Sequence, residues 1–464
     1  MFKKFFDHKA KNITLAAFIL GFFSLLSAAL GFFRDRLLSG RFGAGNELDI
    51  YYTAFRIPDF ISMILIMGAI SAAIVPIFNE YLVRSQKEAW QFLSNLFNVF
   101  LFSLIIICLV LVIFTPQILY LVAPGFSGEK MHFAVLLTRI MFLSPILLGI
   151  SNIISSILQV FQRFLITSLS PLFYNLGIIF GIIFFVPKIG IAGLAWGVVS
   201  GALAHLLIQI PILLGIGFRP LKILNFGHPG ILKIIKLTIP RSIGLAATQI
   251  NLIVITAIAS TLAAGSIAIF NLAESLSRPL LTFIGIAFST AAFPSLSLAF
   301  SEKNKEKFTQ IFFTILSRII FLIVPLSILL FIFRDVFVKI ILKAGKFSGF
   351  DVSLTAACLG LFALGLFAQG LILFIARAFY ALQNTKIPAI TSVMGMVINI
   401  VLSFLFVWLL SFQNYFQQFL IDFLNIQNLN NIKIVGLPLA LSLSAIFQFV
   451  LLFILFKREI KKFS

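Results

Sequence analysis

The chain has 464 residues, of which 61% are hydrophobic and only 11% charged, and its mean hydropathy is +1.12. These values exclude an ordinary soluble domain and indicate an all-α polytopic membrane protein. The net charge of +20 comes from Lys and Arg residues that are scattered singly between apolar runs and form no stripe. No nucleic-acid partner is therefore expected, and the basic residues are interpreted as topology signals.

Runs of about 20 apolar residues, the length that a helix needs to cross the hydrocarbon, predict about twelve membrane-spanning helices. The first run is too long for the core of a signal peptide and lacks a small-residue cleavage site, so it is expected to remain as a helix. The spans are expected at 13–33, 57–79, 90–115, 133–158, 165–187, 189–217, 240–264, 266–298, 309–333, 354–378, 387–410 and 433–456.

An even number of spans places both termini on one side of the membrane. That side carries the larger share of Lys and Arg when the loops are assigned in order along the chain. The positive-inside rule therefore predicts that both termini are cytoplasmic.

An internal repeat relates the two halves of the chain. The sequence LVAPGFSG at 121–128 recurs as ILKAGKFSG at 341–349, and the same offset relates Pro58 to Pro279 and Gln162 to Gln383. The repeat predicts two copies of a six-helix unit, which have the same orientation and are related by an axis along the membrane normal. The domains are expected to be an N-terminal lobe, an amphipathic interfacial linker and a C-terminal lobe, at 1–217, 218–239 and 240–464.

No motif of a catalytic or metal site is visible. The sequence has no GxSxG, no P-loop and no pair of carboxylates at an enzymatic spacing. Cys108 and Cys358 stand alone in apolar stretches, far from any His that would share a metal with them. We predict neither an enzyme nor a metal site.

The most unusual stretch is GFFRDRLLSGRFGAGNELD at 31–49, where charged residues directly follow an apolar span. A charge inside a membrane costs several kcal/mol by some estimates and usually marks a functional site. The span is expected to end near residue 33, with the charges in the outer loop that follows.

Several segments resemble the MurJ (MviN) family, the lipid II flippases of the multidrug/oligosaccharidyl-lipid/polysaccharide exporter superfamily. They are LGFFRDRLLSGRFGAGNELDIYYTAFRIPD (30–59), LVAPGF (121–126), LTRIMFLSP (137–145), TQINLIVITAIASTLAAGS (248–266) and AGKFSGFD (344–351). The resemblance implies a carrier that moves the undecaprenyl-diphosphate-linked peptidoglycan precursor from the inner to the outer leaflet of a bacterial inner membrane by alternating access. It also implies a V of two six-helix lobes around a cationic cavity.

The resemblance and the chemistry of the cargo together predict the binding residues. A lipid diphosphate carries about two negative charges, and hydrocarbon alone solvates these very poorly. Arg stays charged and donates two parallel hydrogen bonds to phosphate oxygens. We therefore expect Arg34, Arg56 and Arg278 to bind the cargo. The alternative for Arg34 and Arg56 is an ordinary anchoring role at the membrane interface.

Two acids and a fourth arginine complete the predicted substrate-binding set. Asp49 and Glu274 are expected to orient the arginines or to moderate their charge, and Arg139 in LTRIMFLSP is the further candidate. Glu274 and Arg278 are four residues apart, so they are also expected to pair along one helix. No soluble cofactor is expected, and coupling to the membrane potential or to a cation is left open.

The chain departs from the family at several points. Family members usually have arginine where this chain has Ala28 and, in the second span, Ser62 and Met63, and they have two more helices that form a groove for the polyprenyl tail. Three alternatives therefore stay open: a flippase for another lipid-linked oligosaccharide, a multidrug antiporter of the same superfamily, and a non-transporting membrane scaffold.

Overall fold

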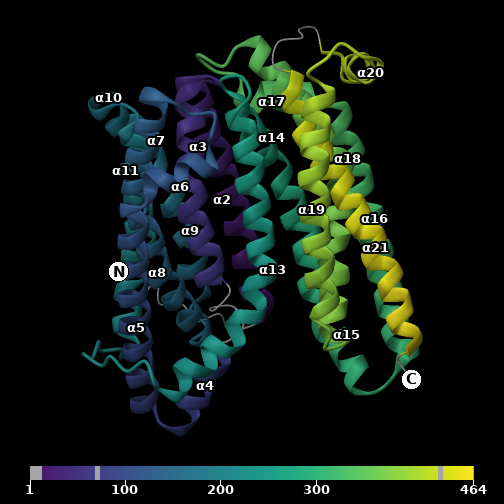
Figure 1. Cartoon of the computed structure of the whole chain (residues 1–464). Coiled ribbons are helices and arrows are strands. Elements are labelled where there is room, and N and C mark those ends of the chain that lie inside the picture. Colours follow the sequence, from purple (N-terminus) through teal and green to yellow (C-terminus); the bar gives the residue numbers. More distant parts are fainter. Residues whose placement is uncertain (1–12, 68–73, 427–431, 463–464) are drawn as a thin grey trace. The chain divides into compact units, whose positions relative to one another are not determined.

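The computed structural model describes residues 13–67, 74–426 and 432–462. Over these residues the chain is helical and contains no β-strand (Figure 1). Helices occupy the described part of each of the twelve predicted spans. Nine helical segments of the described chain are long and apolar enough to cross a membrane: Gln86–Ile113, Gly128–Val160, Phe164–Ile189, Ala192–Gly215, Ser266–Ser301, Lys305–Ile332, Gly349–Ala381, Lys386–Leu409 and Ile432–Lys461.

The described residues form two compact units. The first comprises the described residues within Met1–Leu38 and Ile50–Gln249, and the second comprises those within Ser39–Asp49 and Ile250–Ser464. The short segment Ser39–Asp49 thus belongs to the second unit although it lies early in the sequence. The predicted division into an N-terminal lobe, a linker at 218–239 and a C-terminal lobe was based on the internal repeat, and it stays a prediction.

The helices that lie wholly or mainly in the first unit are α2 (Ile13–Phe42), α3 (Asn46–Ile61), the π-helix η1 (Ser62–Met67), α4 (Val75–Arg84), α5 (Gln86–Ile113), α6 (Thr115–Val122), α7 (Gly128–Met141), α8 (Leu143–Val160), α9 (Phe164–Phe180), the π-helix η3 (Gly181–Phe185), α10 (Val186–Ile189), α11 (Ala192–Leu207), α12 (Ile210–Gly215) and α13 (Pro229–Ser260).

The helices of the second unit are α14 (Ser266–Leu280), the π-helix η4 (Leu281–Ile286), α15 (Ala287–Ser301), α16 (Lys305–Ile332), α17 (Arg334–Leu342), α18 (Gly349–Ala381), α19 (Lys386–Leu409), α20 (Tyr415–Leu424), the 3-10 helix η5 (Ile432–Val435) and α21 (Gly436–Lys462).

Small residues allow α9 and η3 to pack closely on α11 in the first unit. A Cβ atom added to Gly177 would overlap with the backbone of Gly201, and one added to Gly181 would overlap with Gly197. Such close approach of helix backbones is typical of membrane proteins, where small residues line the helix interfaces. These glycines therefore fix the distance between the two helices.

The segment before α13 is held by side chains of α5. Asn95 Nδ2 donates a hydrogen bond to Asn225 O (2.9 Å), and Asn98 Nδ2 donates to Leu221 O and Ile223 O (2.8 Å each). The amphipathic helix expected in this region begins only at Pro229, and it continues without a break into the seventh span as α13. Lys233 Nζ contacts Glu80 of α4 at 2.7 Å.

Aromatic side chains fill the core of the second unit. The Phe312 ring of α16 stacks on Phe374 of α18 with centroids 5.2 Å apart and lies 4.1 Å from the Phe456 ring of α21. The three helices α16, α18 and α21 pack side by side around these rings (Figure 1). The many phenylalanines of this sequence therefore serve helix packing here.

The predicted repeat is visible in two turns of equal geometry. Gln162 follows α8 and Gln383 follows α18, and both have a φ of 58°, in the left-handed region that non-glycine residues rarely adopt. Gln162 N donates to Gln159 O (2.9 Å) and Gln383 N donates to Tyr380 O (3.0 Å), at the same offset. The π-helices η1 and η4 likewise follow Pro58 and Pro279.

Candidate substrate-binding site

The charged stretch at 31–49 is helical as far as Phe42. Helix α2 runs from Ile13 to Phe42, so Arg34, Arg36 and Arg41 lie on a helix, and the expectation that the span ends near residue 33 with charges in a loop is wrong. The apolar run ends there, but the backbone hydrogen bonds continue because charged residues such as Arg are good helix formers. The turn itself is limited to Gly43–Gly45.

The Arg34 guanidinium donates three hydrogen bonds to neighbouring side chains. Its Nε and Nη2 donate to Asp35 Oδ1 at 3.0 and 2.8 Å, and its Nη1 donates to Asn175 Oδ1 of α9 at 3.1 Å. Asp35 is buried, whereas the Arg34 side chain keeps 24% of its surface exposed. The guanidinium is thus held in place, and part of the side chain remains exposed.

Asn175 is a residue of this site that the sequence analysis did not identify. Its Nδ2 donates to Ser27 Oγ (3.3 Å) and to Pro171 O (3.3 Å), which orients its carbonyl oxygen toward Arg34. The available signal was an amide inside the apolar run of the fifth span, since a polar side chain in a span usually hydrogen-bonds to another helix.

Arg56 lies on α3 and is only 6% exposed. Tyr52, one turn earlier on the same helix, is within electrostatic range of Arg56, Arg34 and Asp35. The first unit therefore brings two of the predicted cations, Arg34 and Arg56, into one polar cluster. A buried guanidinium contributes mainly to the electrostatic potential of such a cluster, because the low local dielectric reduces screening.

Asp49 contacts the N-terminal end of α14. Its Oδ2 accepts a hydrogen bond from Gly265 N (2.8 Å) and its Oδ1 accepts one from Ala268 N (3.0 Å). These N–H groups belong to the first turn of α14, where helix N–H groups lack partners within the helix and the dipole favours a negative charge. Asp49 thus caps the helix that carries Glu274 and Arg278.

The turn around Asp49 packs against the loop that precedes α18. Ser39 Oγ donates to Leu342 O (2.7 Å), and Lys346 N donates to Gly40 O (2.7 Å). Gly345 has a φ of +46°, and a Cβ atom added there would overlap with Gly40 O. Two of the motif segments that carry the family resemblance, around 39–49 and 344–351, therefore contact each other in the second unit.

Glu274 and Arg278 form the i, i+4 pair expected on one helix. Arg278 Nη2 and Glu274 Oε1 are 3.0 Å apart, and Arg278 Nε donates to the same oxygen at 3.3 Å. The Arg278 side chain is 60% exposed, more than that of Arg34. Exposed pairs of this kind are weak, so Arg278 can exchange Glu274 for another anion at small cost.

Arg139 lies on α7 and is exposed. Its Nε donates to Val112 O, near the end of α5, at 3.1 Å. This contact satisfies one of the carbonyls that have no partner within a helix C-terminus. Within the described ranges, no group of three or more His, Cys, Asp or Glu side chains lies close enough together to hold a metal ion.

Comparisons with known proteins identify the family. The family model for the lipid II flippase MurJ matches residues 38–464. A "Probable lipid II flippase MurJ" of Buchnera aphidicola subsp. Acyrthosiphon pisum is 33% identical over 383 residues, which cover 81% of this chain and 75% of that protein. The "Lipid II flippase MurJ" of Burkholderia cenocepacia is 28% identical, over 85% of this chain and 78% of that protein.

Solved structures add the fold. A structure of "Lipid II flippase MurJ, inward closed conformation" matches with a TM-score of 0.77 at 25% identity, over 96% of this chain and 90% of that one. An inward-facing multidrug transporter of the MATE family reaches a TM-score of 0.75 at 13% identity, over 94% and 95%, which shows a shared fold alone. The motif-based prediction is confirmed, and the chain belongs to the MurJ family of lipid II flippases.

Proposed function

We propose that this chain carries lipid II, the undecaprenyl-diphosphate-linked peptidoglycan precursor, from the inner to the outer leaflet of a bacterial inner membrane. Membership of the MurJ family supports the cargo, and the nine apolar helical segments of the described chain support a multi-pass carrier. The observation that carries the proposal is Arg34, which is fixed by Asp35 and Asn175 and yet keeps 24% of its side chain exposed.

The diphosphate binds first to Arg34 in this proposal. The ion pair with Asp35 fixes the guanidinium in advance, so little side-chain entropy is lost when phosphate oxygens arrive. Arg56 is buried and raises the positive potential around Arg34. In the second unit, Arg278 is the exposed cation whose weak pair with Glu274 leaves it able to bind an anion. Asp49 and Arg139 act indirectly, because each holds the end of a helix.

The cargo crosses by alternating access, with both termini in the cytoplasm and the prenyl tail in the bilayer. The sites at which the helices bend are the π-helical segments η1 and η4, because each follows a proline and has irregular backbone hydrogen bonding. We expect no catalytic step and no soluble cofactor, and the energy comes from the membrane potential or a cation gradient.

An anionic cargo fits these residues better than a cationic drug. A drug antiporter of the same fold needs acidic side chains in its spans to bind cations and protons. The carboxylate of Asp49 accepts two backbone N–H groups, and that of Glu274 contacts Arg278. Both acids therefore already face positive partners, which disfavours the antiporter.

The test is rescue of growth in a bacterium depleted of its own lipid II flippase. The wild-type chain is expected to restore growth, and Arg34→Ala and Arg56→Ala are expected to lose rescue at normal membrane levels. Lys307→Ala is the matched control, because it also removes a cation but one whose ion pair with Glu302 is exposed. If the wild-type chain inserts normally and does not rescue, it carries a different lipid-linked oligosaccharide or is a scaffold. Rescue by both arginine variants would show that transport does not depend on Arg34 and Arg56.

A further inference from the structure

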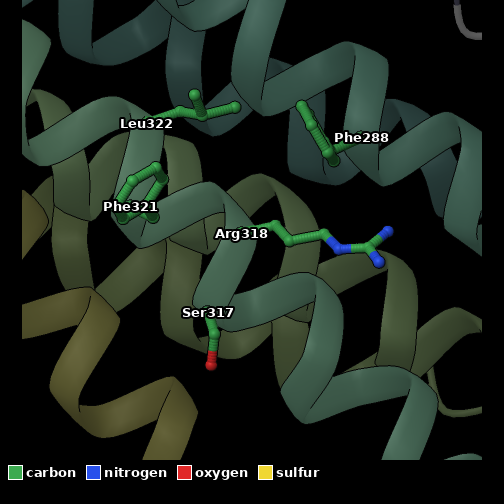
Figure 2. A pocket seen from close by; sticks show the side chains of 5 residues that line it. All are labelled: Phe288, Ser317, Arg318, Phe321 and Leu322. Carbon is green, nitrogen blue, oxygen red and sulfur yellow. The ribbon is translucent and has the colours of Figure 1, made fainter.

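The second unit contains an open groove of about 490 Å³ between α15 and α16. Its lining is Phe288 from α15 and Ser317, Arg318, Phe321 and Leu322 from α16 (Figure 2). A volume of this size lies within the range of small-molecule binding sites. The groove is apolar except for one hydroxyl and one guanidinium.

Arg318 is unlike the other arginines of the spans. Arg34 donates to Asp35 and Asn175, Arg278 to Glu274, and Arg139 to a helix carbonyl. Among the described residues, Arg318 has no hydrogen bond or ion pair. Figure 2 shows its side chain extended away from its own helix.

Arg318 also lies deep along its helix. It is near the middle of α16, about 20 Å from Lys305 at a rise of about 1.5 Å per residue. An arginine at such a depth costs about 2.5–3.5 kcal/mol on insertion scales unless it reaches water or an anion. Helical side chains lean toward the N-terminus of their helix, so the guanidinium is directed to the membrane face at the Lys305 end.

We propose that this groove binds a membrane phospholipid, with the lipid phosphate on Arg318 and one acyl chain against Phe288, Phe321 and Leu322. The guanidinium donates two hydrogen bonds to phosphate oxygens. The lipid comes from the leaflet at the Lys305 end, which the direction of the side chain favours. Arg318 thereby gains the anionic partner that the described protein does not provide.

The charge of the groove selects a phospholipid over a polyprenyl diphosphate. Arg318 is the single charged residue of the lining, and a phosphodiester carries one negative charge. A diphosphate carries about two and needs further donors, which the lining of this groove does not provide. This groove is therefore a lipid site separate from the proposed transport site, and the inference does not depend on the cargo.

The test is photocrosslinking of the full-length chain in maltoside micelles, which contain no phosphate. The probe is phosphatidylglycerol with a diazirine in one acyl chain, and labelled peptides are mapped by mass spectrometry. Labelling of α15 and α16 is expected. Arg318→Leu should raise the half-maximal probe concentration about tenfold, because it removes one charge-assisted hydrogen-bonding group. Diacylglycerol with the same diazirine chain should label wild type and Arg318→Leu equally.

Two variants control for altered packing. Arg377→Leu removes an arginine of the same unit that lies 5.9 Å from the Phe293 ring centroid and does not line the groove, and it should label as wild type. Leu322→Trp fills the groove and should reduce labelling by both lipids. The proposal is overturned if Arg318→Leu labels as strongly as wild type, if Arg377→Leu loses as much, or if undecaprenyl diphosphate displaces the probe more strongly than phosphatidylglycerol does.

Discussion

Asp49 accepts a hydrogen bond of 2.8 Å from the backbone N–H of Gly265, and this contact connects the start of α3 to the start of α14. The same carboxylate accepts Ala268 N at 3.0 Å. Arg56 lies two turns further along α3, and Arg278 lies on α14. Asp49 therefore holds the start of the helix that carries Glu274 and Arg278, and its expected role in orienting arginines stays a prediction.

Removal of this cap should destabilise the second unit. Asp49→Ala leaves two buried N–H groups without their carboxylate, and we expect a loss of about 1–2 kcal/mol in the free energy of unfolding. Asp49→Asn keeps one acceptor oxygen and should lose less. The measurement is thermal unfolding of the purified protein in detergent. An Asp49→Ala protein as stable as the wild type would show that the cap contributes nothing.

The Arg34–Asn175 contact should affect rescue through the orientation of the guanidinium. Asn175→Ala removes the acceptor 3.1 Å from Arg34 Nη1, so Arg34 is held by Asp35 alone. We expect partial loss of rescue for Asn175→Ala. The double variant should lose no more rescue than Arg34→Ala alone, because the two residues act together. Independent, additive losses in the double variant would contradict a role of Asn175 through Arg34.

Glu274→Gln should separate stability from transport. The pair with Arg278 is largely exposed, so its loss should change the free energy of unfolding by less than about 1 kcal/mol. Transport should change, because Arg278 then meets the diphosphate without a competing carboxylate. Thermal unfolding and growth rescue are measured on the same variant. A large drop in stability would show that the pair is structural.

The close contact of α9 and α11 should not tolerate a larger side chain at Gly177. Gly177→Ala places a Cβ atom against the Gly201 backbone, and overpacking of this kind costs about 1–3 kcal/mol. Gly21→Ala is the matched control in α2, because no atom lies within 4 Å of its added Cβ. The Gly21 variant should be as stable as the wild type or slightly more so, since Ala is the better helix former. Equal unfolding temperatures for the Gly177 variant and the wild type would contradict the packing argument.

Substitution of Gly345 by a larger residue should also destabilise the protein, for a different reason. Its φ of +46° disfavours any side chain with a Cβ atom, and Gly40 O already fills the space. Gly345→Ala is expected to cost more than about 1 kcal/mol, because strain and overlap add. Limited proteolysis near residues 39–49 is the direct measurement, and unchanged protection would contradict the contact.

The sequence predicts the spans well and the contacts poorly, for physical reasons. Twenty apolar residues have few alternatives in a membrane, so the position of a span such as Lys386–Leu409 follows from composition. The end of α2 was missed because hydropathy stops at Phe33 while helical hydrogen bonding continues to Phe42. The Arg34–Asn175 contact joins residues 141 positions apart, and no local pattern specifies such a partner.

The candidate site shows the same limit. Arginine was the right residue type to search for, and the pairing of Arg278 with Glu274 followed from their spacing along one helix. The helix cap made by Asp49 did not follow from residue spacing, since Gly265 is far from Asp49 in sequence. Spacing reports on neighbours within a helix, and the interactions between helices need coordinates.

The assignment of Ser39–Asp49 to the second unit bears on how the two copies of the ancestral unit are joined. A chain cut in the segment before Pro229 yields an N-terminal fragment that keeps 39–49 and a C-terminal fragment that lacks them. Neither fragment then holds every piece of its own fold, so the duplicated halves have become mutually dependent. Such fragments should assemble only when they are synthesised together.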